Sequence, residues 1–304
     1  MKPKLWALFL FIVLAPLFQG CFLKSMAVDS IADSLAGTGD TFSSDNDPQL
    51  VGDAIPFSLK LMESVLAATP RHRGLLSALC KNFTEYAYAY VQSKAETIAD
   101  EDYKGSREQK LRAKKLYIRA RDYGLRSLET RFKDFAKSVR SDPKTAVAKI
   151  EKQDAETAYW TGVSWMAAIS VGKDDQELVS DVPQAEALIY KAYELDPDYD
   201  EGSIHDFLIT YEGGKPALMG GSAKKAKEHF EAALKLNKGQ SASTYVNYAE
   251  AVCLKQQNRD EFIEMLNKAL DIDPDKKKSS RLVNLLTQRR ARWLLSRLDT
   301  LFVN

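Results

Sequence analysis

The sequence is poor in the residues that build catalytic centres and metal sites. Only three of its 304 residues are histidine and three are cysteine. His72, His205 and His229 are far apart in the sequence, and none has a spacing typical of a zinc site or of a nucleophile paired with a base. We therefore expect no cofactor, no metal site and no enzymatic activity. An enzyme would need a nucleophile or a metal centre that the sequence does not show.

An excess of charge of one sign is also absent. The chain has 43 basic and 42 acidic residues and a formal net charge of +1 at pH 7. Because this balance provides no attractive field for phosphates, we expect no nucleic-acid partner. Hydrophobic residues make up 45% of the chain, which is typical of a globular protein with a substantial core.

No apolar run is long enough to cross a bilayer, which takes about 20 residues. The longest run, residues 5–15, follows two lysines and is soon followed by a glycine and Cys21. This pattern predicts a secretory signal peptide over residues 1–20. A small residue before a cysteine at the end of a signal is typical of bacterial lipoproteins, so Cys21 is the predicted site of lipid attachment and of membrane anchoring. Alternatively, Cys21 only begins a secreted domain or lies inside an uncleaved anchor.

Small and polar residues dominate the next stretch. Residues 21–48 are predicted to form a lipidated flexible tether, with one short helix around residues 26–35. From residue 49 to residue 304 the pattern is helical almost throughout, and no segment shows sustained alternation of β-branched residues. The predicted fold class is therefore all-α, with one helical domain over residues 49–304.

Long helices are expected in the first half of this domain, with a break where Ser141 and Asp142 precede Pro143. A final helix carries alternating arginine and leucine residues. The predicted ranges are 72–99, 106–140, 154–171 and 279–300.

A repeated spacing indicates the kind of helical fold. In a tetratricopeptide unit, the second helix has small residues seven positions apart, a large apolar residue between them and a proline five positions further on. Small residues allow two helices to approach closely, and proline ends the helix. The matches are Ala185, Ile189, Ala192 and Pro197; Ala226, Phe230 and Ala233, with Lys238 in place of proline; Leu266, Ala269 and Pro274; and a degenerate copy at Ser58, Met62, Val65 and Pro70. This favours stacked, tetratricopeptide-like helix pairs over an unrelated helical bundle with coincidental alanines.

The remaining cysteines lie in apolar, helical surroundings. Cys80 and Cys253 are interpreted as free buried thiols, although a disulfide between them stays open at this stage. His229 falls between the repeat alanines of its predicted helix and is interpreted as an ordinary helix-face residue.

The most unusual segment is rich in tyrosine. On a helix, Phe83, Tyr86 and Tyr90 form one aromatic stripe, while Tyr88 points elsewhere. A second aromatic group contains Trp160. Spacing alone allows either plain core packing or the lining of a partly wet cavity, because phenol groups need polar partners.

These segments also carry a family resemblance. The stretch from residue 47 to residue 92, which contains the tyrosine-rich segment, followed later by Gly220-Gly221-Ser222, resembles the T component of tetratricopeptide-associated TRAP transporters. The resemblance implies a periplasmic lipoprotein, a homotrimer with a hydrophobic cleft or pore in each protomer, and a solute-binding (P) subunit of the transporter as partner. It also raises the cavity interpretation above core packing for the aromatic stripe.

The sequence thus supports the hypothesis of a membrane-anchored periplasmic adaptor for an apolar ligand, a hydrophobic small molecule or a lipid. Its candidate ligand contacts are Phe83, Tyr86, Tyr90 and Trp160. Phe22 after the acylated cysteine favours the outer membrane. The alternative is a scaffold lipoprotein for envelope assembly that has no small-molecule ligand.

Overall fold

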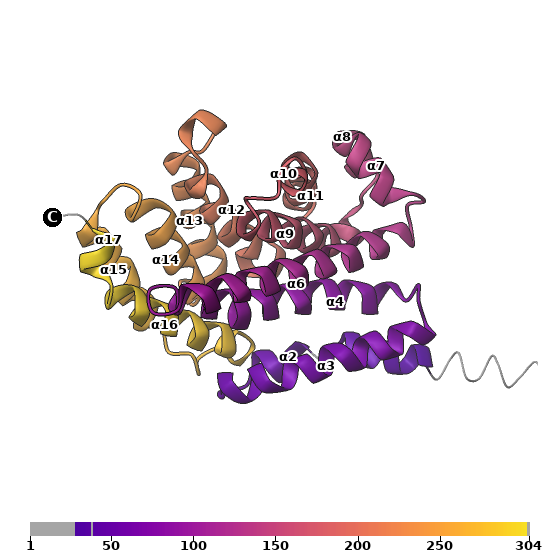
Figure 1. The fold of residues 1–304 in the computed structure, drawn as a ribbon, viewed down its shortest axis with the longest axis horizontal. Helices are drawn as coiled ribbons and strands as arrows, with labels where there is room; N and C mark the ends of the chain where they lie inside the picture. Colours follow the sequence, from indigo (N-terminus) through magenta and orange to yellow (C-terminus); the bar gives the residue numbers. More distant parts are fainter. Residues whose placement is uncertain (1–27, 38, 303–304) are drawn as a thin grey trace, which may run out of the picture.

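The computed structural model describes residues 28–37 and 39–302, and this part of the chain is helical with no strand (Figure 1). The all-α prediction is confirmed. The predicted signal peptide and Cys21 lie outside the described residues.

The first helices lie along one edge of the molecule. Residues 28–36 are helical, as predicted for the short helix in the tether segment, and Ala32 is fully buried. They are followed by α2 (Gly39–Ser43) and α3 (Pro48–Ala68). Asp47 begins α3, because its carboxylate accepts hydrogen bonds from the backbone N–H groups of the first turn and proline fits the first helical position.

The tyrosine-rich segment lies in one long helical stretch. α4 (Arg73–Tyr86) continues into a π-helical segment, η1 (Ala87–Gln92), and then into α5 (Ser93–Thr97). The predicted helix over 72–99 is therefore confirmed, with an insertion of wider turns that the sequence did not predict.

The predicted helix over 106–140 is wrong in one respect, because it is two helices. α6 (Tyr103–Glu129) ends in a turn in which Asp134 has a left-handed backbone (φ 56°), and α7 (Phe135–Ser141) follows. Leu128 and Phe135 are both buried across the turn, so the apolar spacing continues where the helix does not. The predicted break is correct, since Asp142 caps α8 (Pro143–Val147).

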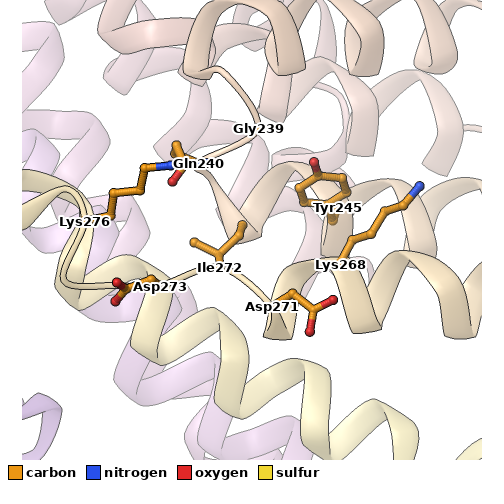
Figure 2. Close-up of a pocket in the computed structure, with 8 residues that line it drawn as sticks. All are labelled: Gly239, Gln240, Tyr245, Lys268, Asp271, Ile272, Asp273 and Lys276. Atoms are coloured by element: carbon orange, nitrogen blue, oxygen red, sulfur yellow. The ribbon is translucent and has the colours of Figure 1, made fainter.

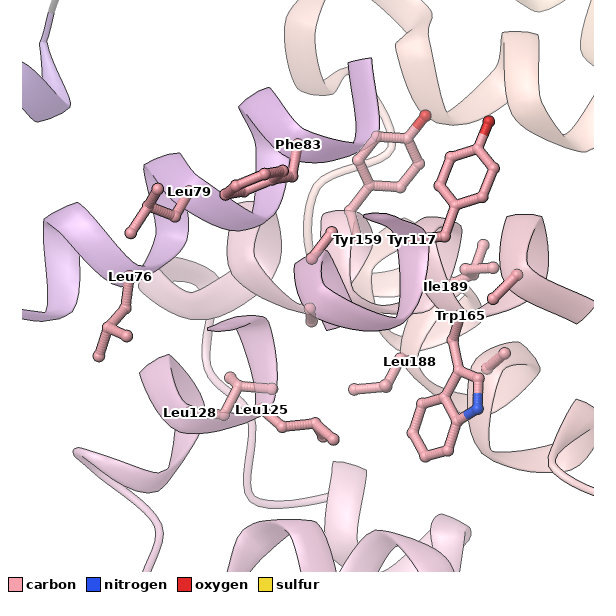
Figure 3. Packing of buried hydrophobic residues seen from close by; sticks show 14 of the residues in the cluster. Leu76, Leu79, Phe83, Tyr117, Leu125, Leu128, Tyr159, Trp165, Leu188 and Ile189 are labelled. Carbon is pink, nitrogen blue, oxygen red and sulfur yellow. The ribbon is translucent and has the colours of Figure 1, made fainter. Parts of the chain in front are cut away.

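The central helices pack in chain order. η2 (Lys152–Asp154) leads into α9 (Ala155–Val171), and α10 (Gln176–Val179) and α11 (Val182–Leu195) follow. α4, α6, α9 and α11 each contact the next, and their buried side chains form one core (Figure 3). Trp165 at its centre is fully buried and donates its indole N–H to Asp181 Oδ2 at 3.1 Å.

The C-terminal half builds a second core. Its elements are η3 (Tyr199–Gly202), α12 (Ser203–Gly214), η4 (Ala217–Met219), α13 (Ala223–Asn237), α14 (Ala242–Tyr248), a second π-helical segment η5 (Ala249–Cys253), α15 (Arg259–Leu270), η6 (Lys278–Ser280), α16 (Arg281–Leu295) and α17 (Leu298–Leu301). α12 contributes Leu208 to the first core and Ile209 to the second, so it joins the two.

The alanines predicted at helix crossings are buried. Ala185, Ala192, Ala226, Ala233 and Ala269 have no exposed surface. Where the repeat proline is replaced, Lys238 adopts a left-handed backbone (φ 55°) and ends α13, so that helix still stops at the predicted place. Both internal cysteines, Cys80 and Cys253, are buried and free, as predicted.

The last long helix returns to the first ones. α16 contacts α2, α3, α14 and α15, and Arg281 Nη1 donates to the backbone oxygen of Ser44 at 2.9 Å. α16 therefore packs beside the first helices along the lower edge of the molecule in Figure 1.

Candidate functional site

The predicted aromatic stripe is packed between α3, α4 and α6. Phe83 is buried and stacks on Tyr123 with ring centroids 5.9 Å apart. Tyr86 is buried and stacks on Tyr90 at 5.8 Å. The Tyr90 hydroxyl donates to the backbone oxygen of Pro48 at 2.9 Å. The structure thus brings these three residues together, and their contact with a ligand stays a prediction.

The fit of Tyr90 depends on a glycine. A Cβ atom at Gly52 of α3 would overlap the Tyr90 ring, so α3 can approach this ring only because residue 52 has no side chain. Burial raises the pKa of the Tyr90 phenol to about 12, which keeps the group a neutral hydrogen-bond donor.

The π-helical segment separates Tyr88 from this stripe. Its wider turn is closed by a hydrogen bond that the backbone N–H of Ser93 donates to the backbone carbonyl oxygen of Tyr88, five residues earlier. About half of the Tyr88 surface is exposed, yet burial by the surrounding protein still raises the pKa of its phenol. Helical spacing in the sequence predicts only that Tyr88 points away from the stripe. It does not identify Tyr88 as a candidate site residue, because a π-bulge has no reliable sequence signal.

One arginine connects the helices opposite Tyr88. The Arg290 guanidinium of α16 forms two bonds of 2.7 Å to the Glu250 carboxylate in η5 and one of 2.6 Å to Glu96 in α5. The charges of all three groups act on the Tyr88 phenol. This network connects α5, which directly follows the first π-helical segment, to the second π-helical segment through α16.

Trp160 lies in a different aromatic group from the stripe. The ring centroids of Trp160 and Tyr159 are 5.2 Å apart. The Tyr159 ring also packs on Tyr199, with centroids 5.7 Å apart, and on Phe207, with centroids 6.5 Å apart. We call Tyr159, Trp160, Tyr199 and Phe207 the Trp160 cluster. Trp160, Tyr199 and Phe207 are only partly buried, so the cluster presents aromatic surface from α9, η3 and α12.

Hydrogen bonds orient this cluster. The Trp160 indole N–H donates to the Tyr199 hydroxyl at 3.2 Å, which donates to Glu156 at 2.9 Å. The Tyr159 hydroxyl donates to the backbone oxygen of Ser203 at 2.9 Å. Since these polar groups already have protein partners, the rings can offer apolar faces to a ligand without leaving a polar group unpaired.

Carboxylates border the Trp160 cluster. Burial raises the pKa of Asp206 to about 7, although hydrogen bonds from Thr244 and Ser241 favour the charged form. Burial also raises the pKa of Glu85, whose side chain nevertheless keeps contact with solvent.

The structure also pairs two histidines that the sequence analysis placed in unrelated contexts. His205 Nδ1 of α12 lies 2.9 Å from His229 Nδ1 of α13. Both imidazole rings make T-shaped contacts with the Tyr193 ring. Burial lowers the pKa of His205 to about 4 and also lowers the pKa of His229. Within the described ranges no group of three or more histidine, cysteine or acidic residues has metal-site geometry.

A shallow, open pocket of about 370 Å³ has none of the candidate site residues in its lining (Figure 2). It is lined by Gly239, Gln240, Tyr245, Lys268, Asp271, Ile272, Asp273 and Lys276. Its mixed, largely charged lining differs from the apolar cleft that the resemblance implies. We call it the comparison pocket.

Comparison with known proteins gives a consistent picture. A family described as TRAP transporter T-component matches residues 44–302. An uncharacterized protein of Treponema pallidum (strain Nichols) is 31% identical over 306 residues, which is 95% of each chain. Among the described residues, no helix combines the length and the apolar character needed to span a membrane. The matching family consists of transporter components rather than enzymes, and its role indicates a location at the cell envelope. This chain belongs to the TRAP transporter T-component family.

Proposed function

We propose that this protein is a membrane-anchored periplasmic adaptor that binds the solute-binding subunit of a TRAP-type transporter and receives an apolar or amphipathic ligand at the Trp160 cluster. Lipid on Cys21 supplies the anchor, stacked tetratricopeptide-like helix pairs supply the docking surface, and three copies assemble. Family membership and the burial of the repeat alanines support this proposal.

The observation that carries the ligand part of the proposal is the partly exposed aromatic surface around Trp160. Partly exposed aromatic rings with bonded polar tips favour capture of an apolar group, because burial contributes roughly 25 cal/mol per Å² of apolar surface. Tyr88 is half exposed beside the Arg290 network and is the proposed polar contact.

The aromatic stripe has a lesser part in this proposal. Phe83 and Tyr86 are buried, and Tyr90 is bonded to α3. They are retained as proposed ligand contacts that form the wall behind Tyr88, and α3 must shift for a ligand to reach them.

This packing is also the observation that favours the second candidate function. A scaffold lipoprotein without a small-molecule ligand needs aromatic side chains only for its core, and the stripe is packed as a core would be. The two functions differ in whether the native protein carries apolar cargo.

Native mass spectrometry of the purified protein, combined with extraction and identification of bound compounds, tests the choice. The adaptor function predicts a reproducible apolar compound that is lost in Trp160→Ala and kept in Tyr245→Ala, which alters the comparison pocket of Figure 2. An empty wild-type protein that still binds the solute-binding subunit would establish the scaffold function instead.

A further inference from the structure

The outer side of α3 carries an apolar stripe that nothing in the described chain covers. Leu50, Ala54, Phe57 and Leu61 follow one another at helical spacing and so share one side of the helix. The side chains of Leu50, Phe57 and Leu61 are 59%, 73% and 41% exposed. We call these four residues the α3 stripe.

The α3 stripe is not needed to hold α3 on the protein. The opposite side of the helix already supplies Val51, Leu59, Met62 and Leu66 to the core, and each of these is buried. α3 is therefore apolar on two sides. Exposed apolar surface of this kind is typical of an interaction site in a soluble domain.

The position of α3 relative to Cys21 favours one occupant. Six residues lie between Cys21 and residue 28, and the seven residue steps that join these two positions reach at most about 25 Å even when fully extended. The helix over residues 28–36 packs on the same core as α3, with Ala32 buried and Asp33 paired with His72 at 3.2 Å. In Figure 1, α3 lies in the outermost layer of the molecule, with no helix below it.

We propose that the α3 stripe lies on the membrane that holds the acyl chains of Cys21, so that α3 rests in the interface parallel to the bilayer. This inference depends on the lipid anchor in the proposed function. With a length of about 31 Å, α3 can place all four apolar residues in the headgroup region at once. The stripe is flanked by one acidic and one basic residue, Asp53 and Lys60, so the contact is driven by apolar burial and is insensitive to salt and to lipid charge.

Site-specific fluorescence on the acylated full chain tests this orientation. An environment-sensitive nitrobenzoxadiazole label is attached at Phe57→Cys, at Leu61→Cys, or at the matched control Thr210→Cys, an exposed position on α12. The two internal cysteines are buried and stay unlabelled. The protein is reconstituted on vesicles of phosphatidylethanolamine and phosphatidylglycerol that contain nitroxide-labelled lipid.

The proposal predicts that the labels at 57 and 61 shift to shorter wavelength and are quenched by the nitroxide lipid, at low and high salt alike, while the label at 210 is unchanged. Protein that floats with the vesicles but shows no quenching at 57 and 61 would overturn this inference and leave the proposed function intact. Protein that does not float would overturn the lipid anchor and this inference together. Labels at 57 and 61 that are already shielded without vesicles, and are not quenched with them, would show that the stripe joins two copies of the chain and would also overturn it.

Discussion

Arg290 and Glu250 form a two-bond ion pair, with both nitrogen–oxygen distances at 2.7 Å, and the same arginine reaches Glu96 across the molecule. α16 thereby holds together elements that lie 194 and 40 residues away in the sequence. The two side chains of the main pair are 18% and 26% exposed, so water only partly screens the interaction.

Removing the guanidinium should therefore destabilise the fold. Arg290→Ala leaves two carboxylates facing each other without a cation and is expected to lower the free energy of unfolding by about 2–3 kcal/mol, somewhat less than for a fully buried pair. Arg289→Ala, at an exposed neighbouring position, is the control and is expected to cost less than about 0.5 kcal/mol. Denaturant unfolding measures both, and equal effects would contradict the role of Arg290.

Two helical glycines offer a matched test of packing between helices. A Cβ at Gly124 of α6 would overlap Thr161 Oγ1 and lie 2.9 Å from Cys80 Sγ, whereas nothing lies within 4 Å of a Cβ at Gly214. Gly124→Ala should lower the free energy of unfolding by about 1–3 kcal/mol through overpacking. Gly214→Ala should leave it unchanged or raise it by up to about 1 kcal/mol. A neutral Gly124→Ala would show that α4, α6 and α9 are less closely packed.

The histidine pair should make the protein sensitive to acid. The pKa of His205 is about 4 in the fold and near 6.5 when unfolded, so the unfolded chain binds more protons in this window and stability falls as pH drops from 6.5 to 4. The groups acting on the pair are Asp198 near His205, and Glu212, Glu228 and Lys225 near His229. The free energy of unfolding should therefore fall less between pH 6.5 and pH 4 in His205→Phe than in the wild type, by on the order of 2 kcal/mol. Denaturant unfolding over a series of pH values measures this difference. An unchanged slope would contradict the burial of a neutral His205.

Asp206 should have the opposite effect. Its pKa is about 7 in the fold against 3.8 for the exposed group, so between these values the folded protein binds more protons than the unfolded chain. The stability that this proton contributes is complete near pH 4 and is lost as pH rises through 7. Asp206→Asn keeps an oxygen that can accept from Thr244 and should be more stable than the wild type at pH 8 but not at pH 4. The measurement is thermal unfolding at the two pH values, and an equal difference at both would refute the raised pKa.

The internal cysteines should be inert in the folded protein. Burial raises the pKa of both Cys80 and Cys253 to about 12, and the thiolate is the reactive form. Neither thiol should react with a disulfide reagent before unfolding, whereas the Phe57→Cys variant should gain one rapidly reacting thiol. Reaction of the wild type at the same rate would contradict the buried positions.

The sequence predicts local features well where one residue decides them. The helix break predicted before Pro143 is present, with Asp142 as the cap of α8, and the repeat alanines lie at buried positions as expected. The turn between α6 and α7 was missed because no proline or glycine marks it, and its apolar spacing continues through the turn. Local propensity is a weak guide where tertiary packing selects the backbone.

The candidate site was predictable only in part. The sequence identified the stripe and a second aromatic group with Trp160, but not the rings that complete the second group, because Tyr199 and Phe207 come from η3 and α12. The contact between His205 and His229 depends on which sides of α12 and α13 face each other. The sequence also did not place Tyr88 near Arg290, because α16 returns to this part of the chain only in the folded protein.

Titration with N-phenyl-1-naphthylamine, an apolar dye that fluoresces when it leaves water, tests the central claim that the Trp160 cluster receives an apolar ligand. The account predicts saturable fluorescence enhancement for the wild type and for Tyr245→Ala, and at least about a tenfold weaker affinity for Trp160→Ala, since one indole face contributes more than 1.4 kcal/mol. Equal binding by the wild type and Trp160→Ala, or loss of binding in Tyr245→Ala alone, would contradict it.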